Sequence, residues 1–224
     1  KRCFLYLRGE VLENLLITLK ELLYVFPAIL IAFTVHEYAH ALASVILGDP
    51  TPKLEGRLSL NPFVHLDLVG TLMLIVFKFG WAKPVMINPQ YYKHPKRDMG
   101  VVAFAGPLAN FILAFLSFLV VNLILKLTNG DVGIALYATY TFFRYFAIIN
   151  LGLGVFNMLP FPPLDGSKVL SAFLPMNIFL KYMQLEPYGM AILVILVFTN
   201  LLSTPLNFIL GNLINIFDAL TSLM

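Results

Sequence analysis

Cysteine and charged residues are scarce in this sequence. One cysteine, Cys3, occurs among 224 residues, which excludes an intrachain disulfide and a zinc site built from cysteine ligands. Charged residues make up 12% of the chain, about half the share typical of soluble domains, and the net charge is only +3. This balance argues against a nucleic-acid partner. Together with 59% hydrophobic residues, it indicates a membrane protein.

Long apolar runs predict five or six helical segments. A helix needs about 20 apolar residues to cross the hydrocarbon core of a bilayer. Residues 66–79 form a shorter run, which favours a re-entrant or tilted segment sheltered by protein. Residues 1–20 alternate charged and apolar positions and fit either an interfacial amphipathic helix or a partial span. The remaining predicted segments are residues 22–47, 99–127, 132–159, 189–202 and 205–220.

Neither a repeat nor a linker divides the chain. We therefore expect one domain over residues 1–224 with an all-α, polytopic membrane fold, ending in a pair of C-terminal helices within residues 188–222. One stretch departs from the helical pattern: in KLEGRLSL, residues 53–60, leucines alternate with polar residues, and Asp-Pro and Asn-Pro turn signals flank it. This pattern predicts a small membrane-associated β-hairpin near residues 51–61.

Basic residues predict the orientation of the chain in the membrane. Five lysines and arginines lie between Lys78 and Arg97 without any acidic residue, whereas the turn at residues 128–131 has no basic residue. Loops rich in lysine and arginine remain on the cytoplasmic side. We therefore expect the basic loop to be cytoplasmic and the 128–131 turn to lie on the opposite side.

Three ionisable residues interrupt the predicted span at residues 22–47, in the sequence HEYAH. His36 and His40 are four residues apart, so a helix stacks them on one face, where they can share one metal ion, usually zinc. Glu37 lies about 100° around the helix, a position that suits a general base acting on a metal-activated water. The pattern arises by chance in soluble proteins, but ionisable residues inside a membrane span are functional by default.

Two histidines and a water leave tetrahedral zinc one ligand short. A candidate for the missing ligand lies in NMLPFPPLDG, residues 157–166, where three prolines prevent a regular helix and Asp165 follows them. Taken alone, this stretch also fits an ordinary turn at the membrane surface.

Together, the two motifs resemble those of the site-2 protease family of intramembrane zinc metalloproteases, which pairs His-Glu-x-x-His with Asn-x-x-Pro-x-Pro-x-Leu-Asp-Gly. The resemblance extends over about residues 22–170, the expected catalytic core, and the chain looks like the compact branch without PDZ or CBS domains. It implies one zinc ion per chain. It also implies roles for five residues: His36, His40 and Asp165 as zinc ligands, Glu37 as catalytic base, and Asn157 as the residue that holds the substrate or the oxyanion.

The resemblance also implies a substrate and a location. The activity would be hydrolysis of peptide bonds within or near transmembrane segments of membrane-anchored substrates, as in regulated intramembrane proteolysis. The expected partners are the lipid bilayer and a single-span membrane protein, and the expected location is the cell membrane, with a multi-pass topology. The basic loop predicts that the active site faces the cytoplasm, because the span at residues 132–159 then runs inward and brings Asn157 and Asp165 to the cytoplasmic side. We further hypothesise that residues 53–60 form a sheet whose edge clamps the unwound substrate beside the zinc.

Two other functions fit parts of the pattern. A metal transporter would explain intramembrane histidines, but it predicts several ligand sets along a path and only one is evident. A non-catalytic scaffold would have no need of Glu37.

Several further polar or small residues have structural interpretations. These are a capping or core role for His65, which could instead contact the substrate or a metal ligand, an N-cap role for Asp67, solvation for His94 in the basic loop, and close helix packing for Gly106 and Asn110.

Overall fold

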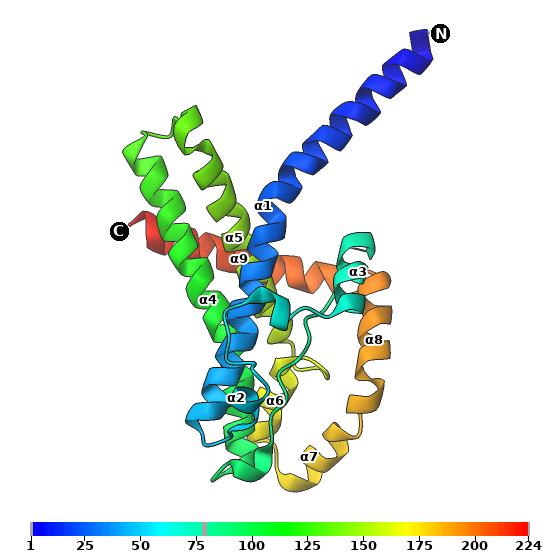
Figure 1. Ribbon diagram of the computed structural model, residues 1–224, viewed down its shortest axis with the longest axis vertical. Helices are drawn as coiled ribbons and strands as arrows, with labels where there is room; N and C mark the ends of the chain where they lie inside the picture. Colours follow the sequence, from blue (N-terminus) through cyan, green and yellow to red (C-terminus); the bar gives the residue numbers. More distant parts are fainter. Residues whose placement is uncertain (1, 78–79, 224) are drawn as a thin grey trace.

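Helices dominate the computed structural model, which describes the backbone of residues 2–77 and 80–223 and the side chains of residues 19–73, 80–179, 181–182 and 184–223. Figure 1 shows their arrangement. The α-helices are α1 (Arg2–Ile46), α2 (Thr51–Leu54), α3 (Leu68–Phe77), α4 (Pro95–Leu127), α5 (Ile134–Asn157), α6 (Asp165–Phe173), α7 (Met176–Met183), α8 (Glu186–Phe198) and α9 (Ser203–Ser222). In the described part of the chain, two short 3₁₀ helices, η1 (Pro62–Val64) and η2 (Pro89–Tyr91), lie in the loops.

Three of these helices are long and apolar enough to cross a membrane: the Leu19–Ile46 part of α1, α4 and α5. Helices α8 and α9 together make a fourth candidate, but an 81° bend separates them. The predicted segment at residues 66–79 forms only the ten-residue helix α3 within the described residues. Each of the six predicted runs therefore contains a helix, but among the described residues three helices are long and apolar enough to cross a membrane, or four if the bent pair is one span.

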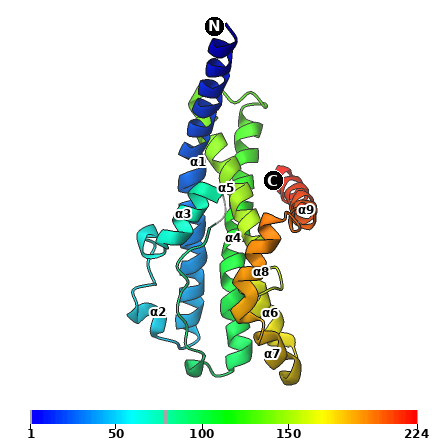
Figure 2. The same cartoon turned by 90° about the vertical axis from the view of Figure 1, so that its right-hand side faces the viewer.

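Small residues allow the three spans to pack closely. Ala28 and Ala32 of α1 are fully buried against Phe146 of α5, and Ala114 of α4 packs with Ala147 of α5. Side chains this small let helix backbones approach in a membrane, where van der Waals packing replaces the hydrophobic effect. In Figures 1 and 2, α4 and α5 form an antiparallel hairpin beside α1, and α9 crosses that hairpin.

The predicted β-hairpin near residues 51–61 is wrong. Residues 51–54 form helix α2, no strand occurs there, and the β-bridge found in the described residues joins Leu66 to Ala82. The alternating pattern predicted the wrong structure because a polar side chain is buried here and an apolar one is exposed. Arg57 is only 5% exposed and donates to the carbonyl of Val64, whereas Leu54 is 81% exposed. In a membrane protein an outward leucine can face lipid, so alternation alone does not identify the buried face.

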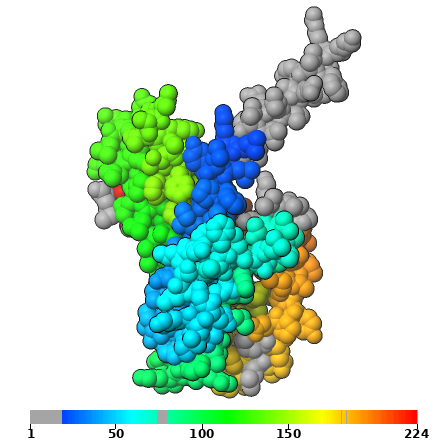
Figure 3. Space-filling view, in the orientation of Figure 1, coloured from blue at the N-terminus to red at the C-terminus, as the bar shows by residue number. Residues whose placement is uncertain are grey.

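The hypothesis of a substrate clamp at residues 53–60 fails with the hairpin, because it required a free strand edge there. This segment instead belongs to the chain that follows α1, drawn in cyan in Figure 3, which lies over the lower part of α1 on the face shown there. Two interpretations in this region are confirmed. Asp67 caps α3 by accepting a 2.7 Å hydrogen bond from the backbone N–H of Gly70, and the buried His65 contacts the carbonyl of Ser59 through Nε2 at 2.8 Å.

Candidate metal centre

The two histidines of α1 point to the same place. His36 and His40 are 4% and 8% exposed, and their rings meet edge to face with centroids 4.6 Å apart. Their Nε2 atoms are 3.0 Å from each other. The spacing of four residues therefore gives the shared face that the sequence predicts.

Asp165 joins the two histidines from the first turn of α6. Its Oδ2 atom lies 3.1 Å from His36 Nε2 and 3.2 Å from His40 Nε2. Tetrahedral zinc with bonds of about 2.0–2.1 Å separates neighbouring ligand atoms by about 3.3 Å. Among the side chains that the structure describes, these three form one group with metal-ligand geometry, and their donor set fits zinc.

The prolines after α5 position Asp165. Helix α5 ends at Asn157, and the chain runs through the proline-rich stretch before α6 begins at Asp165 itself. Gly166 allows this return, because a Cβ there would lie 2.2 Å from the carbonyl oxygen of Met158. Burial disfavours the charged form of Asp165, but the adjacent His40 and His36 imidazoles outweigh it and hold the pKa of this carboxyl below its usual range.

The outer nitrogen of each imidazole has a buried acceptor. His36 Nδ1 lies 2.6 Å from Asn110 Oδ1, and His40 Nδ1 lies 2.7 Å from the carbonyl oxygen of Val102, both on α4. Because these oxygens accept hydrogen bonds from Nδ1–H, Nε2 is the nitrogen of each ring that is left for a metal ion. Such outer contacts fix the tautomer and orientation of metal-binding histidines.

Asn110 is itself oriented by a chain of amides. Its Nδ2 donates to the carbonyl of Ala32 and, at 2.8 Å, to Asn150 Oδ1, and Asn150 Nδ2 donates to the carbonyl of Phe146. Both asparagines are fully buried. The carbonyl of Phe146 fixes the Nδ2 group of Asn150, and the carbonyl of Ala32 fixes the Nδ2 group of Asn110. The remaining Oδ1 atom of Asn110 therefore faces His36. The sequence interpretation gave Asn110 a packing role only and missed this contact.

Replacing Asn150 with leucine should lower zinc affinity by about 10- to 100-fold, the usual effect of removing an outer contact of a metal ligand. Asn150 touches neither imidazole, so the effect would pass through the orientation of Asn110. Competition with a chelator measures the affinity. The matched control is Asn122→Leu, because Asn122 joins α4 to Asp218 of α9 away from the metal site. Equal affinities of wild type and Asn150→Leu would contradict the orienting role.

Glu37 and Asn157 lie beside the group of His36, His40 and Asp165. A cavity of about 160 Å³ is lined by both residues together with His36, His40 and Asp165. Glu37 Oε2 accepts a 3.2 Å hydrogen bond from the backbone N–H of Val85. The structure therefore brings together all five residues that the sequence singled out, whereas His94 is exposed on the surface, as expected.

The loop that contacts Glu37 is fastened to the end of α1 by Asp49. This carboxylate is fully buried and accepts hydrogen bonds from Ser44 Oγ and from the backbone N–H groups of Thr51 and Asn88. Burial would raise the pKa of Asp49, but these hydrogen bonds outweigh it and hold the pKa below its usual range. Asn88 lies three residues beyond Val85, so Asp49 fixes the segment that holds Glu37.

The sequence interpretation also gave Gly106 only a helix-packing role. A Cβ at this position would lie 2.3 Å from His40 Nε2 and 2.8 Å from His36 Cε1. The glycine therefore leaves the space that the imidazoles occupy. The fold and this site are those expected of a metal-dependent hydrolase embedded in a membrane.

Comparison with known proteins identifies the family. Residues 124–202 match peptidase family M50. The chain is 38% identical over 200 residues to a Bacillus subtilis (strain 168) protein named "Putative zinc metalloprotease YwhC", with 88% of this chain and 86% of that protein covered. Two proteins of the same description are MJ0611 of Methanocaldococcus jannaschii, 39% identical over 46% of this chain and 49% of its own length, and Rip2 of Mycolicibacterium smegmatis, 28% identical over 76% and 64%.

The chain belongs to peptidase family M50, the site-2 proteases, and is a zinc metalloprotease. No solved structure matches it.

Proposed function

We propose that this protein hydrolyses peptide bonds within or near the transmembrane segments of membrane-anchored proteins. The observation that supports this best is the position of the metal-ligand group. His36 and His40 lie inside an apolar helix that is long enough to span a bilayer, and they contact a second such helix, α4. A substrate cleaved at this site must therefore bring its peptide bond among the membrane-spanning helices.

In this proposal His36, His40 and Asp165 hold one zinc ion per chain. Bound zinc supplies a Lewis acid that polarises the scissile carbonyl and lowers the pKa of a water to about 7. The carboxylate of Glu37 would accept a proton from a water molecule as the oxygen of that water attacks the carbonyl carbon. Glu37 then gives the proton to the leaving nitrogen as the C–N bond breaks.

Asn157 is proposed to stabilise the oxyanion that forms during this attack. Its Nδ2 donates to the carbonyl of Leu153 at 3.0 Å, which holds the amide in place and leaves its second N–H for the substrate. Its location in the same cavity as Glu37 supports this role.

We propose a single catalytic domain, with residues 22–170 as the core and residues 188–222 as C-terminal helices. The substrate class is a single-span membrane protein, because its helix must unwind locally to expose a peptide carbonyl. The competing transporter hypothesis predicts a series of ligand sets, and the described side chains contain one group of three metal-ligand residues.

Cells that carry Glu37→Gln in place of the wild type should accumulate intact single-span membrane proteins that the wild type cleaves. Quantitative proteomics of the membrane fraction identifies them. A transporter would change cellular metal content instead, so metal analysis of the same cells is the control. An unchanged set of membrane proteins would contradict intramembrane proteolysis.

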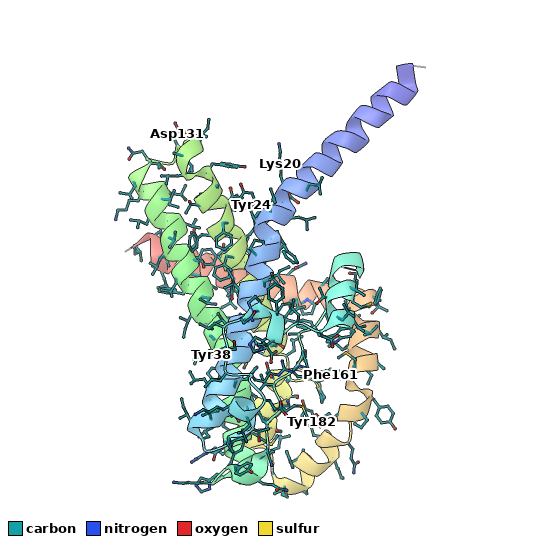
Figure 4. All side chains as sticks on the ribbon, in the orientation of Figure 1. Lys20, Tyr24, Tyr38, Asp131, Phe161 and Tyr182 are labelled. Carbon is teal, nitrogen blue, oxygen red and sulfur yellow. The ribbon has the colours of Figure 1, made fainter. Side chains whose placement is uncertain are left out.

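We also propose that the site opens toward the cytoplasm in a multi-pass protein of the cell membrane. The turn that contains Asp131 and the segment that contains Tyr182 lie at opposite ends of the molecule in Figure 4, and α6, which contributes Asp165, lies toward the Tyr182 end. The first turn of α4, which carries Lys96 and Arg97, lies at that end too (Figure 1), which supports a cytoplasmic location.

Single cysteines at residues 83 and 129 should react with a membrane-impermeant maleimide from opposite faces of the membrane. Lys83 lies in the basic loop and Asn129 in the turn between α4 and α5, and both are exposed. The experiment uses Lys83→Cys and Asn129→Cys in a Cys3→Ser background, which removes the one native cysteine. Labelling of both from the same face would overturn the topology.

A further inference from the structure

A second cavity, of about 460 Å³, adjoins the catalytic residues. It lies between α1, α5, α8 and the loop after α3. His36, Glu37 and Asn157 line both this cavity and the smaller one at the metal-ligand group, so the two cavities adjoin each other at these residues. The volume falls within the range of about 300–1,000 Å³ that is usual for ligand sites.

The wall of this cavity is apolar away from those three polar residues. Phe33 of α1, Phe156 of α5, and Met190 and Leu193 of α8 line it, together with Trp81. An apolar wall with polar groups at one end fits a ligand whose apolar part fills the cavity while its reacting part remains at the polar end. For a peptide, the apolar part is a side chain next to the cleaved bond.

Gly152 of α5 leaves part of this cavity open. It lines the cavity, and a Cβ at this position would have no atom within 4 Å. Gly154, two residues later, differs, because its Cβ would lie 2.7 Å from the ring of Phe111. Helix packing therefore requires a small residue at position 154 but not at position 152. At position 152 the lack of a side chain has one effect, which is to enlarge the cavity.

We propose that this cavity is a substrate subsite for a large apolar side chain, aromatic or branched aliphatic, adjacent to the cleaved bond, and that Gly152 sets the size of side chain it accepts. The inference rests on the proposed protease function and names the substrate residue that the same site selects. A phenylalanine at residue 152 would extend from α5 into the space that the substrate side chain needs.

Trp81 provides a direct readout, because it is the one tryptophan of the chain and it lines this cavity. The purified zinc-loaded protein is titrated with acetohydroxamate, which can bind zinc but has no large side chain, and with 3-phenylpropanohydroxamate, which adds a phenyl group. Tryptophan fluorescence and zinc content are followed in the wild type, in Gly152→Phe and in Gly211→Phe. Gly211 of α9 is the matched control, since its Cβ would also have no atom within 4 Å and it does not line the cavity.

We expect the wild type and Gly211→Phe to bind the phenyl compound about 10- to 100-fold more tightly than acetohydroxamate, as burial of a phenyl group predicts. In Gly152→Phe this preference should fall to about twofold or less, with zinc content and acetohydroxamate binding retained. A wild type that responds alike to both compounds, or a preference that survives in Gly152→Phe, would overturn the subsite.

A second measurement separates this inference from the proposed function. The same three proteins are incubated with a synthetic single-span peptide that carries alanine, leucine and phenylalanine at its central positions, and the new termini are mapped by mass spectrometry. Gly152→Phe should shift cleavage from leucine and phenylalanine toward alanine. Absence of cleavage in the wild type, with the hydroxamate preference intact, would count against the proposed function and leave the cavity as an apolar binding site.

Discussion

Glutamine in place of Glu37 should reduce peptide-bond cleavage by about 10²- to 10⁴-fold, the usual contribution of a general base. Glutamine keeps the shape of the side chain, and its amide oxygen can still accept the hydrogen bond from the N–H of Val85. It cannot accept a proton from water. The loss should therefore appear in kcat with little change in KM, because the substrate contacts are retained.

Zinc content is the readout that makes this result specific. Glu37 lies one residue from His36, but its carboxylate contacts Val85, so Glu37→Gln should retain zinc at the wild-type level. Glu55→Gln is the matched control: Glu55 is exposed beyond α2 and does not line either cavity. Cleavage by Glu37→Gln within about tenfold of wild type would contradict the assignment of the base.

Alanine in place of Gly106 should remove most of the bound zinc. The cleavage activity should then fall by at least about 10²-fold. The added methyl group would lie 2.3 Å from the nitrogen of His40 that faces Asp165, a distance that real Cβ atoms do not reach. The imidazole would have to move, and it is held from its other side by the carbonyl of Val102 at 2.7 Å. The methyl group and the imidazole of His40 therefore cannot both be accommodated without breaking the contact between His40 and Val102.

Metal analysis of the purified variant tests this expectation. Gly154→Ala is the control for overpacking in general, because its Cβ would press on the ring of Phe111 at 2.7 Å and not on an imidazole. Overpacking of this kind usually costs about 1–3 kcal/mol of stability. Both variants should therefore unfold at lower temperature, but only Gly106→Ala should lose zinc. Full zinc occupancy in Gly106→Ala would show that the histidines do not need this space.

The spans were predictable from sequence because a bilayer imposes its length on a helix. The predicted runs 22–47, 99–127 and 132–159 correspond to parts of α1, α4 and α5 within a few residues at most boundaries. The prediction failed for the β-hairpin near residues 51–61, a short stretch on which the bilayer imposes no length. Residues 51–54 form a helical turn with Pro52 in its first turn, and Arg57 is buried by hydrogen bonds to loop carbonyls that no periodic pattern encodes.

The sequence by itself determined the local part of the site. Helical geometry places His36 and His40 on one face, and the prolines after Asn157 end α5 and allow α6 to begin at Asp165, because both effects depend only on neighbouring residues. Only the tertiary structure decided which groups meet across the chain. Asp165 reaches His36 from 129 positions away, and Asn110 from 74.

The same distinction explains why Asn110, Gly106 and Gly152 had no functional interpretation in the sequence. An asparagine or a glycine in an apolar helix predicts close packing on general grounds. Whether it contacts an imidazole, leaves room for one or opens a cavity depends on the side chains that α1, α4, α5 and α8 bring together. These contacts arise from the packing of helices that are distant in sequence, and local periodicity contains no information about them.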